Sequence, residues 1–197
     1  LPDGAIQAAA AVAHRSGKPV FAHANSGADV LAAIRGGVDV IAHTTPQSGP
    51  WDEPILAALK DRRVALTPTL SLWKHCLLHD RLSTQQQSVD ASIEQLRAWV
   101  GSGGAVLFGT DLGAVDPDPT EEYTLMAEAG MGFLQVLASL TSAPAELFEE
   151  SERLGRIAAG LPADLVVLWN DPSKDLRALA AVRYTLRAGT ILSRDGE

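Results

Sequence analysis

Three residues that can bind a metal ion stand at the ends of apolar segments: His23, His43 and Asp111. The segments are PVFAH (19–23), VDVIAH (38–43) and AVLFGTD (105–111). Continuous apolar runs of this length are typical of strands that are covered on both faces, as in a parallel sheet. In an α/β barrel, the C-terminal ends of the parallel strands carry the chemistry. Packing alone does not explain three metal-binding residue types at three such ends.

These side chains have the chemistry of a hydrolytic metal site. Neutral imidazole and carboxylate are good zinc ligands, and a catalytic zinc keeps one position open for water. The metal lowers the pKa of that water toward about 7, which gives hydroxide at neutral pH. An aspartate beside the water can take its proton and pass it to a leaving nitrogen. Taken singly, each histidine also fits a core residue bonded to backbone, and Asp111 fits a turn cap.

Helical and strand patterns alternate along most of the chain. The spacing of apolar residues and the turn formers predict helices over 3–17, 27–36, 52–63, 75–102, 121–129 and 132–150, the last with a break or fresh start at Pro144. Strands are expected over 19–23, 38–43, 64–73 and 105–111. This alternation predicts parallel strands joined by helical crossovers. The tail differs, because strands at 163–169 and 182–192 have no ordinary helix between them, and RAGT predicts a hairpin pairing 182–187 with 190–193.

Four parallel strands make half of an eight-stranded barrel and cannot close one. Leu1 is not a natural initiator, and the chain opens directly on a helical pattern. We therefore expect an α/β fold in which residues 1–152 form the C-terminal half of a (β/α)8 TIM-type barrel and 153–197 add strands to a small β-sandwich. An open doubly wound sheet and a natural half-barrel that dimerises are the alternatives. The missing N-terminal half would be a partner, and exposed sheet edges predict homo-oligomers.

Composition argues against several classes of partner. A net charge of −8 and a pI near 5.1 argue against nucleic acid and against an anionic membrane surface. No apolar run reaches the roughly 20 residues that a membrane span needs. The single cysteine, Cys76, excludes an intrachain disulfide. We expect a small-molecule substrate, and a cytoplasmic location is slightly favoured.

The ordered set of motifs resembles the amidohydrolase superfamily of metal-dependent hydrolases, closest to its imidazolonepropionase-like and peptidase-like branch. FAHAN (21–25), VDVIAHTT (38–45) and LFGTD (107–111) are similar to that family's fifth, sixth and eighth barrel strands. APAELF (143–148) and LGRIAAGLPADLVVLWNDP (154–172) resemble its exit from the barrel into a small β-sandwich built from both chain ends. The resemblance covers nearly the whole chain. The family's H-x-H pair on the first strand and its lysine on the fourth are absent, so residues upstream of Leu1 would supply them.

The resemblance implies a role for each candidate residue. His23 and Asp111 would be metal ligands, and Asp111 would also be the general base. His43 would be either a second ligand in a two-metal site or a catalytic group that polarises the substrate carbonyl in a one-metal site. Apart from the resemblance, the positions of Trp51 in the loop after the second expected strand and of Trp73 at the end of the third predict that they line the substrate pocket, although aromatic residues there are often core or rim. The cofactor would be one or two divalent ions, zinc first, with iron, nickel or manganese as alternatives.

The function implied is hydrolysis of an amide or cyclic amide C–N bond through a metal-activated water, with this chain as a fragment of the enzyme that is inactive alone. Two other classes stay open at this point. The chain could be a non-catalytic remnant or binding module with an incomplete metal site. It could also be an open-sheet α/β protein without metal, in which His23 and Asp111 serve the substrate.

Overall fold

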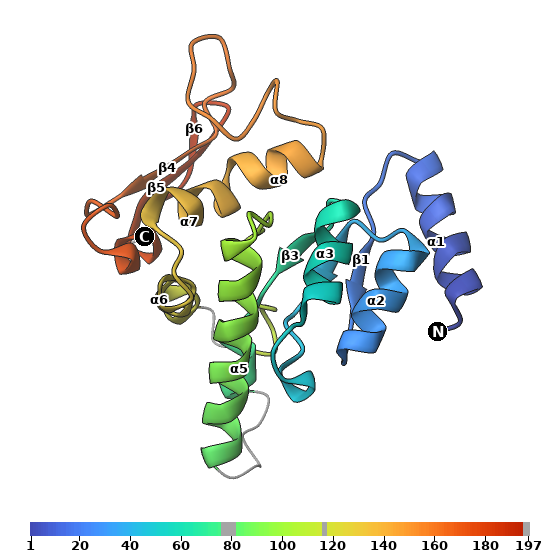
Figure 1. Ribbon diagram of the computed structural model, residues 1–197. Helices are drawn as coiled ribbons and strands as arrows, with labels where there is room; N and C mark the ends of the chain where they lie inside the picture. The colour runs from blue at the N-terminus through green and yellow to red at the C-terminus, as the bar shows by residue number, and fades with distance from the viewer. Residues whose placement is uncertain (76–81, 116–117, 195–197) are drawn as a thin grey trace.

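The computed structural model describes residues 1–75, 82–115 and 118–194, and for residues 82–85 it describes the backbone alone. The chain forms an α/β part with a parallel sheet, followed by a small antiparallel sheet (Figure 1). Cys76 and the start of the helix expected over 75–102 lie outside the described residues. The division of the chain at residue 152 stays a prediction.

The parallel sheet confirms three of the expected strands and their direction. It consists of β1 (Phe21–His23), β2 (Val40–Ala42) and β3 (Ala65–Thr67), in that order. Phe21 pairs with Val40, which pairs with Ala65, so His23, Ala42 and Thr67 end the strands at one level. Because all three strands run the same way, the residues that follow them meet at one edge of the sheet.

The fourth expected strand is present only as a short contact. Val106 forms an isolated parallel bridge with Leu66, through hydrogen bonds of 3.0 Å from Leu66 N–H to Ala105 O and 2.9 Å from Leu107 N–H to Leu66 O. Residues 105–107 therefore lie beside β3 without forming a regular strand. Gly109 lies close to β3, where an added Cβ would come 2.6 Å from Thr67 Cγ2.

The third expected strand was too long. The range 64–73 holds β3 at 65–67 only, and Leu72 already belongs to helix α4 (Leu72–His75). The apolar character of residues 70–73 misled the expectation, because burial in a loop and helix gives the same pattern as a buried strand. Leu70, Leu72 and Trp73 are buried in either case.

The helices agree with the expectation in order and differ at some ends. They are α1 (Asp3–Arg15), α2 (Gly27–Gly36), α3 (Glu53–Asp61), α5 (Leu82–Gly101), α6 (Thr120–Glu128), α7 (Phe133–Leu140) and α8 (Ser142–Leu147), with a 3-10 turn η1 (Pro46–Ser48). Ser26 and Asp52 cap α2 and α3 by accepting from Asp29 and Ile55 N–H. The break expected at Pro144 falls at Thr141, and Pro144 lies in the first turn of α8, where its missing N–H is tolerated.

The two faces of the parallel sheet are covered unequally. Ile41 and Leu66 belong to the main core, which α2, α3 and α5 cover with buried residues such as Ile34, Leu59 and Leu96. On the other face, Val40, Ala65 and Leu107 form a small cluster with Ala143 and Leu147, which lie in α8. Phe21, at the start of β1, is 47% exposed. One face of the sheet is thus fully packed against helices, and the other face is only partly covered.

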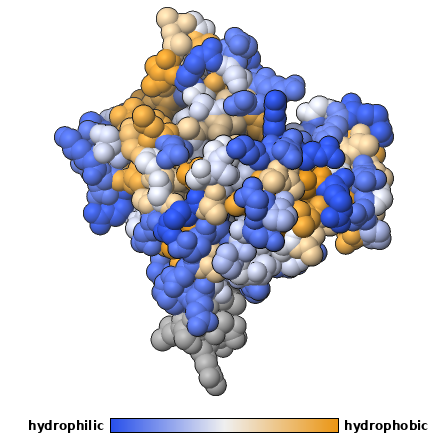
Figure 2. Space-filling view, in the orientation of Figure 1, coloured by the Kyte–Doolittle hydropathy of each residue, from blue (hydrophilic) through white to orange (hydrophobic). Residues whose placement is uncertain are grey.

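The tail confirms the expected hairpin. Its sheet contains β4 (Leu165–Leu168), β5 (Val182–Arg187) and β6 (Thr190–Arg194), all antiparallel, with the 3-10 turn η2 (Leu176–Ala180) before β5. Leu179 of η2 is buried in the main core and joins this sheet to α6. Apolar side chains of the sheet remain exposed, among them Val166, Trp169 and Leu192. Figure 2 shows hydrophobic surface gathered over this C-terminal region.

Within the described ranges, no helix is both long enough and apolar enough to cross a lipid bilayer.

Candidate metal-binding and catalytic site

Three residues beyond the strand ends have left-handed backbone conformations. The φ angles are +71° at His43, +47° at Thr69 and +63° at Asp111. Residues other than glycine rarely adopt such angles, and a β-branched threonine is an outlier there. Strain of this kind costs on the order of 1–3 kcal/mol per residue and is found where function needs an unusual side-chain direction. The edge of the sheet that carries His43 and Asp111 is therefore shaped by more than packing.

The hydrogen bonds of His43 fix which ring nitrogen carries the proton. Its Nδ1 lies 2.7 Å from Thr69 Oγ1, and that hydroxyl lies 2.8 Å from the Pro68 carbonyl oxygen. A carbonyl only accepts, so the single hydroxyl proton of Thr69 is donated to Pro68. Thr69 Oγ1 must then accept from His43 Nδ1–H. In the neutral ring this leaves a lone pair on Nε2, which is the form that binds metals.

His23 and His43 lie close together at this edge, and Asp111 is near enough to act on the charge of His43. The imidazole rings of His23 and His43 meet edge to face, with 4.9 Å between their centroids. Burial and the charge of His23 lower the pKa of His43, and the nearby carboxylate of Asp111 opposes this by raising it. His23 is exposed, and its Nε2 lies 3.0 Å from Asn25 Oδ1. Two imidazoles and a carboxylate thus share one accessible edge.

A buried hydrogen-bond network holds the chain that follows His43. Gln95 of α5 accepts from Thr45 N–H at 2.8 Å and donates to the carbonyls of Thr45 at 2.9 Å and Gly49 at 2.5 Å. The indole of Trp51 donates to Thr45 Oγ1, and that of Trp73 donates to Thr44 Oγ1, both at 2.8 Å. Thr44, Thr45 and Gln95 are fully buried. These contacts hold the strained His43 backbone in place.

A buried carboxylate holds the chain that follows Thr69. Glu122 of α6 is fully buried, and its oxygens accept from Leu70 N–H at 2.9 Å and Ser71 N–H at 2.8 Å. Burial raises the pKa of Glu122 from its ordinary 4.5 to about 7, aided by the neighbouring Glu121 carboxylate and opposed by these hydrogen bonds. The carboxylate is on the apolar side of α6, beside Met126.

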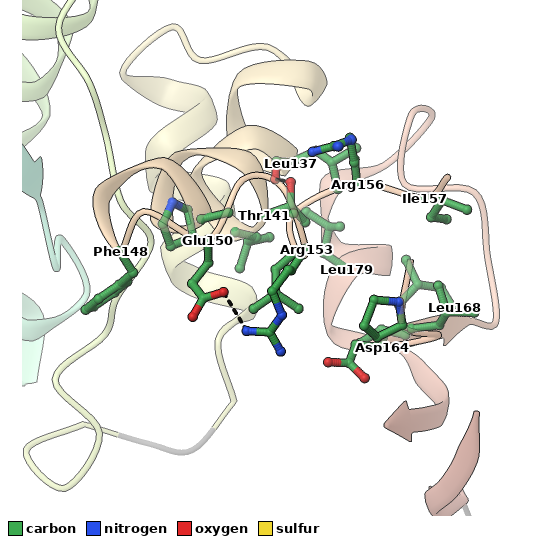
Figure 3. A pocket seen from close by; sticks show the side chains of 18 of the residues that line it. Leu137, Thr141, Phe148, Glu150, Arg153, Arg156, Ile157, Asp164, Leu168 and Leu179 are labelled. Atoms are coloured by element: carbon green, nitrogen blue, oxygen red, sulfur yellow. Dashed lines mark hydrogen bonds and ion pairs between the residues drawn. The ribbon is translucent and has the colours of Figure 1, made fainter. Parts of the chain in front are cut away.

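Two cavities in the described part of the chain are lined by neither His23 nor His43. One of about 1050 Å³ lies between α7, α8 and β4, with Thr141, Phe148 and Leu168 among its lining residues (Figure 3). Another of about 520 Å³ is lined by Ser71, Lys74 and residues of α6. No group of three His, Cys, Asp or Glu side chains that could hold a metal ion occurs in the described part of the chain. His23, His43 and Asp111 therefore form an incomplete donor set.

Residues 1–193 match the family model described as the amidohydrolase family. The chain belongs to the amidohydrolase family. It is also 22% identical over 195 residues to ochratoxinase from Aspergillus niger, a match that spans 93% of this chain and 40% of that protein. The chain thus spans less than half the length of this relative.

Solved structures show the same fold. An Xaa-Pro dipeptidase with bound methionine superposes with a TM-score of 0.84 at 22% identity, covering 97% of this chain and 48% of that one. A putative prolidase from Bifidobacterium longum gives 0.83 at 27% identity, with 97% and 51% covered. Aspergillus niger ochratoxinase gives 0.83 at 19% identity, with 100% and 46% covered. The mixed α/β fold with its parallel sheet is that of amidohydrolase structures.

The structure brings some of the sequence-predicted site residues together at the strand ends and buries others in the core. His23, His43 and Asp111 share one edge, and their roles stay predictions. Trp51 and Trp73, expected to bind substrate, are 4% and 9% exposed in the main core, with their indole N–H groups on Thr45 and Thr44. Their substrate role also stays a prediction, and the contacts that the structure shows are with the chain behind His43.

Sequence reasoning missed Thr69, Gln95 and Glu122. A signal was present for two of them, because Gln95 and Glu122 are polar residues on the apolar faces of α5 and α6, beside Leu96 and Met126. A buried polar side chain within an apolar stripe indicates a specific hydrogen-bond partner. Thr69 gave no signal, since its role depends on a backbone angle that the sequence does not show.

We predict that Gln95→Leu lowers the free energy of unfolding by about 3 kcal/mol, because it leaves the buried Thr45 N–H and the Gly49 carbonyl without a hydrogen-bond partner. Urea unfolding of the chain measures the effect. Gln86→Leu, on the exposed side of the same helix, is the control and should change stability by less than about 0.5 kcal/mol. Equal effects of the two substitutions would contradict the network described above.

We also predict a pH-dependent contribution of Glu122 to stability. Its pKa of about 7 in the folded chain exceeds the ordinary 4.5, so the folded chain holds this proton more tightly. The favourable contribution is fully present below pH 4.5 and is lost as the pH rises through about 7. The loss amounts to about 3 kcal/mol, from a shift of roughly 2.5 units. Unfolding curves from pH 4 to 8 should show this dependence in the unsubstituted chain and in Glu121→Gln, and lack it in Glu122→Gln.

Proposed function

We propose that this chain is the C-terminal half of the (β/α)8 barrel of a metal-dependent amidohydrolase, with part of a β-sandwich attached. The enzyme cleaves an amide-type C–N bond by means of a metal-activated water. His23, His43 and Asp111 supply this half's share of the metal ligands. The observation that carries the proposal is the arrangement of these three side chains at one strand edge, with His43 held as the tautomer whose Nε2 lone pair is free.

The unequal faces of the parallel sheet support the half-barrel. Parallel sheets normally have both faces covered. Here one face has a finished core, whereas Phe21 on the other is 47% exposed. In a barrel, that second face would meet the side chains of the strands that complete the ring. The coverage of 46–51% in solved structures that superpose with TM-scores of 0.83 or more supports the same interpretation.

The residues present fit part of a divalent metal site. Imidazole and carboxylate are suitable donors, and the second nitrogen of His43 is hydrogen bonded, as metal-binding histidines usually are. Thr67 Oγ1, at the end of β3, is buried without a hydrogen-bond partner among the described residues. An unpaired buried polar atom calls for a further group at this edge. Zinc is the first choice for such donors, with iron, nickel or manganese as alternatives.

Each residue has a definite task in the proposed reaction. When bound, a divalent metal would supply a Lewis acid and a water of lowered pKa. Asp111, exposed at the edge of the sheet, would take the proton of the attacking water and hand it to the leaving nitrogen. His43 would hold the metal through Nε2. Thr69 would keep the His43 ring in the required tautomer and direction.

The names of the relatives suggest where to look for the substrate. Solved structures at 27–28% identity are described as prolidases, one of them in complex with N-methylphosphonate-L-proline. We therefore propose dipeptides that end in proline and other N-acyl amino acids as the first substrates to test, followed by cyclic amides. Specificity lies in loops that differ among proteins of one fold, so the fold itself does not fix the substrate.

The first test is zinc titration of the chain, followed by NMR of the histidine side chains. We predict weak binding that shifts His23 and His43 but leaves unshifted His14, which pairs with Asp39 at the opposite end of the sheet. Asp111→Asn should weaken binding at least about tenfold, and His14→Ala should not. Zinc binding without a shift of the His23 and His43 signals would contradict the proposed site. It would favour a non-catalytic remnant or a metal-free α/β protein.

The same proposal predicts how activity depends on the rest of the barrel. The chain alone should lack efficient hydrolysis, because the donor set is incomplete. Adding a separately expressed N-terminal half and zinc should restore hydrolysis of a dipeptide that the complete enzyme cleaves. Asp111→Asn in this chain should abolish that restored hydrolysis. Full turnover by residues 1–197 alone would show that the half-barrel proposal is wrong.

A further inference from the structure

The proposed hydrolysis leaves one buried ionisable side chain without a task. Glu122 is fully buried in α6, and both carboxylate oxygens accept backbone N–H groups, from Leu70 and Ser71. Burying a carboxylate costs several kcal/mol unless hydrogen bonds compensate. An apolar residue would fill this position without that desolvation cost. The carboxylate is therefore explained by the backbone groups that it binds.

It holds the segment that contains the strained Thr69. Thr69 has a φ of +47°, which is unfavourable for a β-branched residue. The next two residues, Leu70 and Ser71, give their N–H groups to Glu122, at 2.9 and 2.8 Å. Hydrogen bonds to an ionised acceptor are about twice as strong as neutral ones. Glu122 thus stabilises the backbone immediately after the strained residue.

Thr69 in turn controls the ring of His43. Its hydroxyl accepts from His43 Nδ1–H at 2.7 Å and donates to the Pro68 carbonyl at 2.8 Å. If the segment shifted, the hydroxyl would leave this position, and the neutral His43 ring could place its proton on either nitrogen. The path from α6 to the histidine therefore runs from the Glu122 carboxylate to the Leu70 and Ser71 amides, along the chain to the Thr69 hydroxyl, and from there to the imidazole.

We infer that Glu122 is a positioning residue for His43: by holding the amides of Leu70 and Ser71, it places the Thr69 hydroxyl where this hydroxyl keeps the proton of His43 on Nδ1 and leaves Nε2 free. The inference rests on the proposed function in one respect only, namely that the free Nε2 of His43 binds a metal. The link between Glu122 and the imidazole is a property of the folded chain, with or without a metal.

The test measures the tautomer of His43 by NMR of the nitrogen-labelled chain without metal, at about pH 8, where His43 is neutral because its pKa is lowered from the ordinary 6.5. The unsubstituted chain should show the proton on Nδ1. In Glu122→Gln the amide NH₂ replaces one acceptor, so one of the two backbone N–H groups loses its partner. We expect the ratio of the Nδ1–H to the Nε2–H form of His43 to fall by roughly three- to tenfold, the value of one hydrogen bond.

Two controls separate positioning from a general loss of structure. Glu121→Gln makes the same change at the neighbouring residue, whose carboxylate pairs with Lys74 and His75 of α4, and should leave the His43 tautomer unchanged. His14 is an internal reference in every spectrum, because it pairs with Asp39 far from Thr69. A change at both histidines would indicate unfolding, and the milder Glu122→Asp would then take the place of Glu122→Gln.

A double substitution tests the path itself. Thr69→Val removes the hydroxyl with little change of shape and should shift the tautomer as Glu122→Gln does. If Glu122 acts through Thr69, adding Glu122→Gln to Thr69→Val should produce no further shift. The inference would be overturned if a folded Glu122→Gln or Glu122→Asp chain kept the Nδ1–H form of His43. It would also be overturned if the effects of Glu122→Gln and Thr69→Val on the tautomer were additive. Absence of zinc binding at His43 would instead count against the proposed function.

Discussion

The hydrogen bond between His43 Nδ1–H and the Thr69 hydroxyl connects the fold of this amidohydrolase-family chain to its proposed chemistry. It joins the residues that follow two neighbouring parallel strands, β2 and β3, at the edge where those strands end. This hydrogen bond fixes the tautomer of His43, and the tautomer determines which ring nitrogen has a free lone pair to bind a metal ion. Both residues have left-handed backbone angles, with φ of +71° at His43 and +47° at Thr69. Much of the surrounding structure serves to hold those angles.

Two buried polar side chains from different helices hold the two strained segments. Gln95 in α5 binds the backbone of Thr45 and Gly49, and Glu122 in α6 binds the amides of Leu70 and Ser71. The indoles of Trp51 and Trp73 add bonds to the two threonines after His43. A buried hydrogen-bond network destabilises the fold when any of its polar groups lacks a partner, and it makes the surrounding chain rigid when every group is paired. The helices therefore contribute to the site although none of their side chains is proposed to touch the metal.

The sequence predicted the order of the elements and brought His23 and His43 to one edge of the sheet, since both stand at the ends of apolar runs, whereas the chemical roles of these residues and of Asp111 stay predictions. The helix starts expected at residues 27 and 52 agree to within one residue with α2 and α3, which Ser26 and Asp52 cap. The long third strand was wrong, because an apolar run does not distinguish a strand from a buried loop. The supporting shell was not predicted, because the partners of Gln95 and Glu122 lie 46 to 52 residues away along the chain.

The central claim is that this edge of the sheet binds a metal through His43 Nε2 together with His23 and Asp111. The most direct measurement is the anomalous scattering at the zinc edge from crystals of the zinc-loaded barrel, formed by this chain and the N-terminal half. The account predicts a peak about 2.0–2.2 Å from His43 Nε2 and from donor atoms of His23 or Asp111. A peak bound through His43 Nδ1, or zinc bound only elsewhere on the protein, would contradict it.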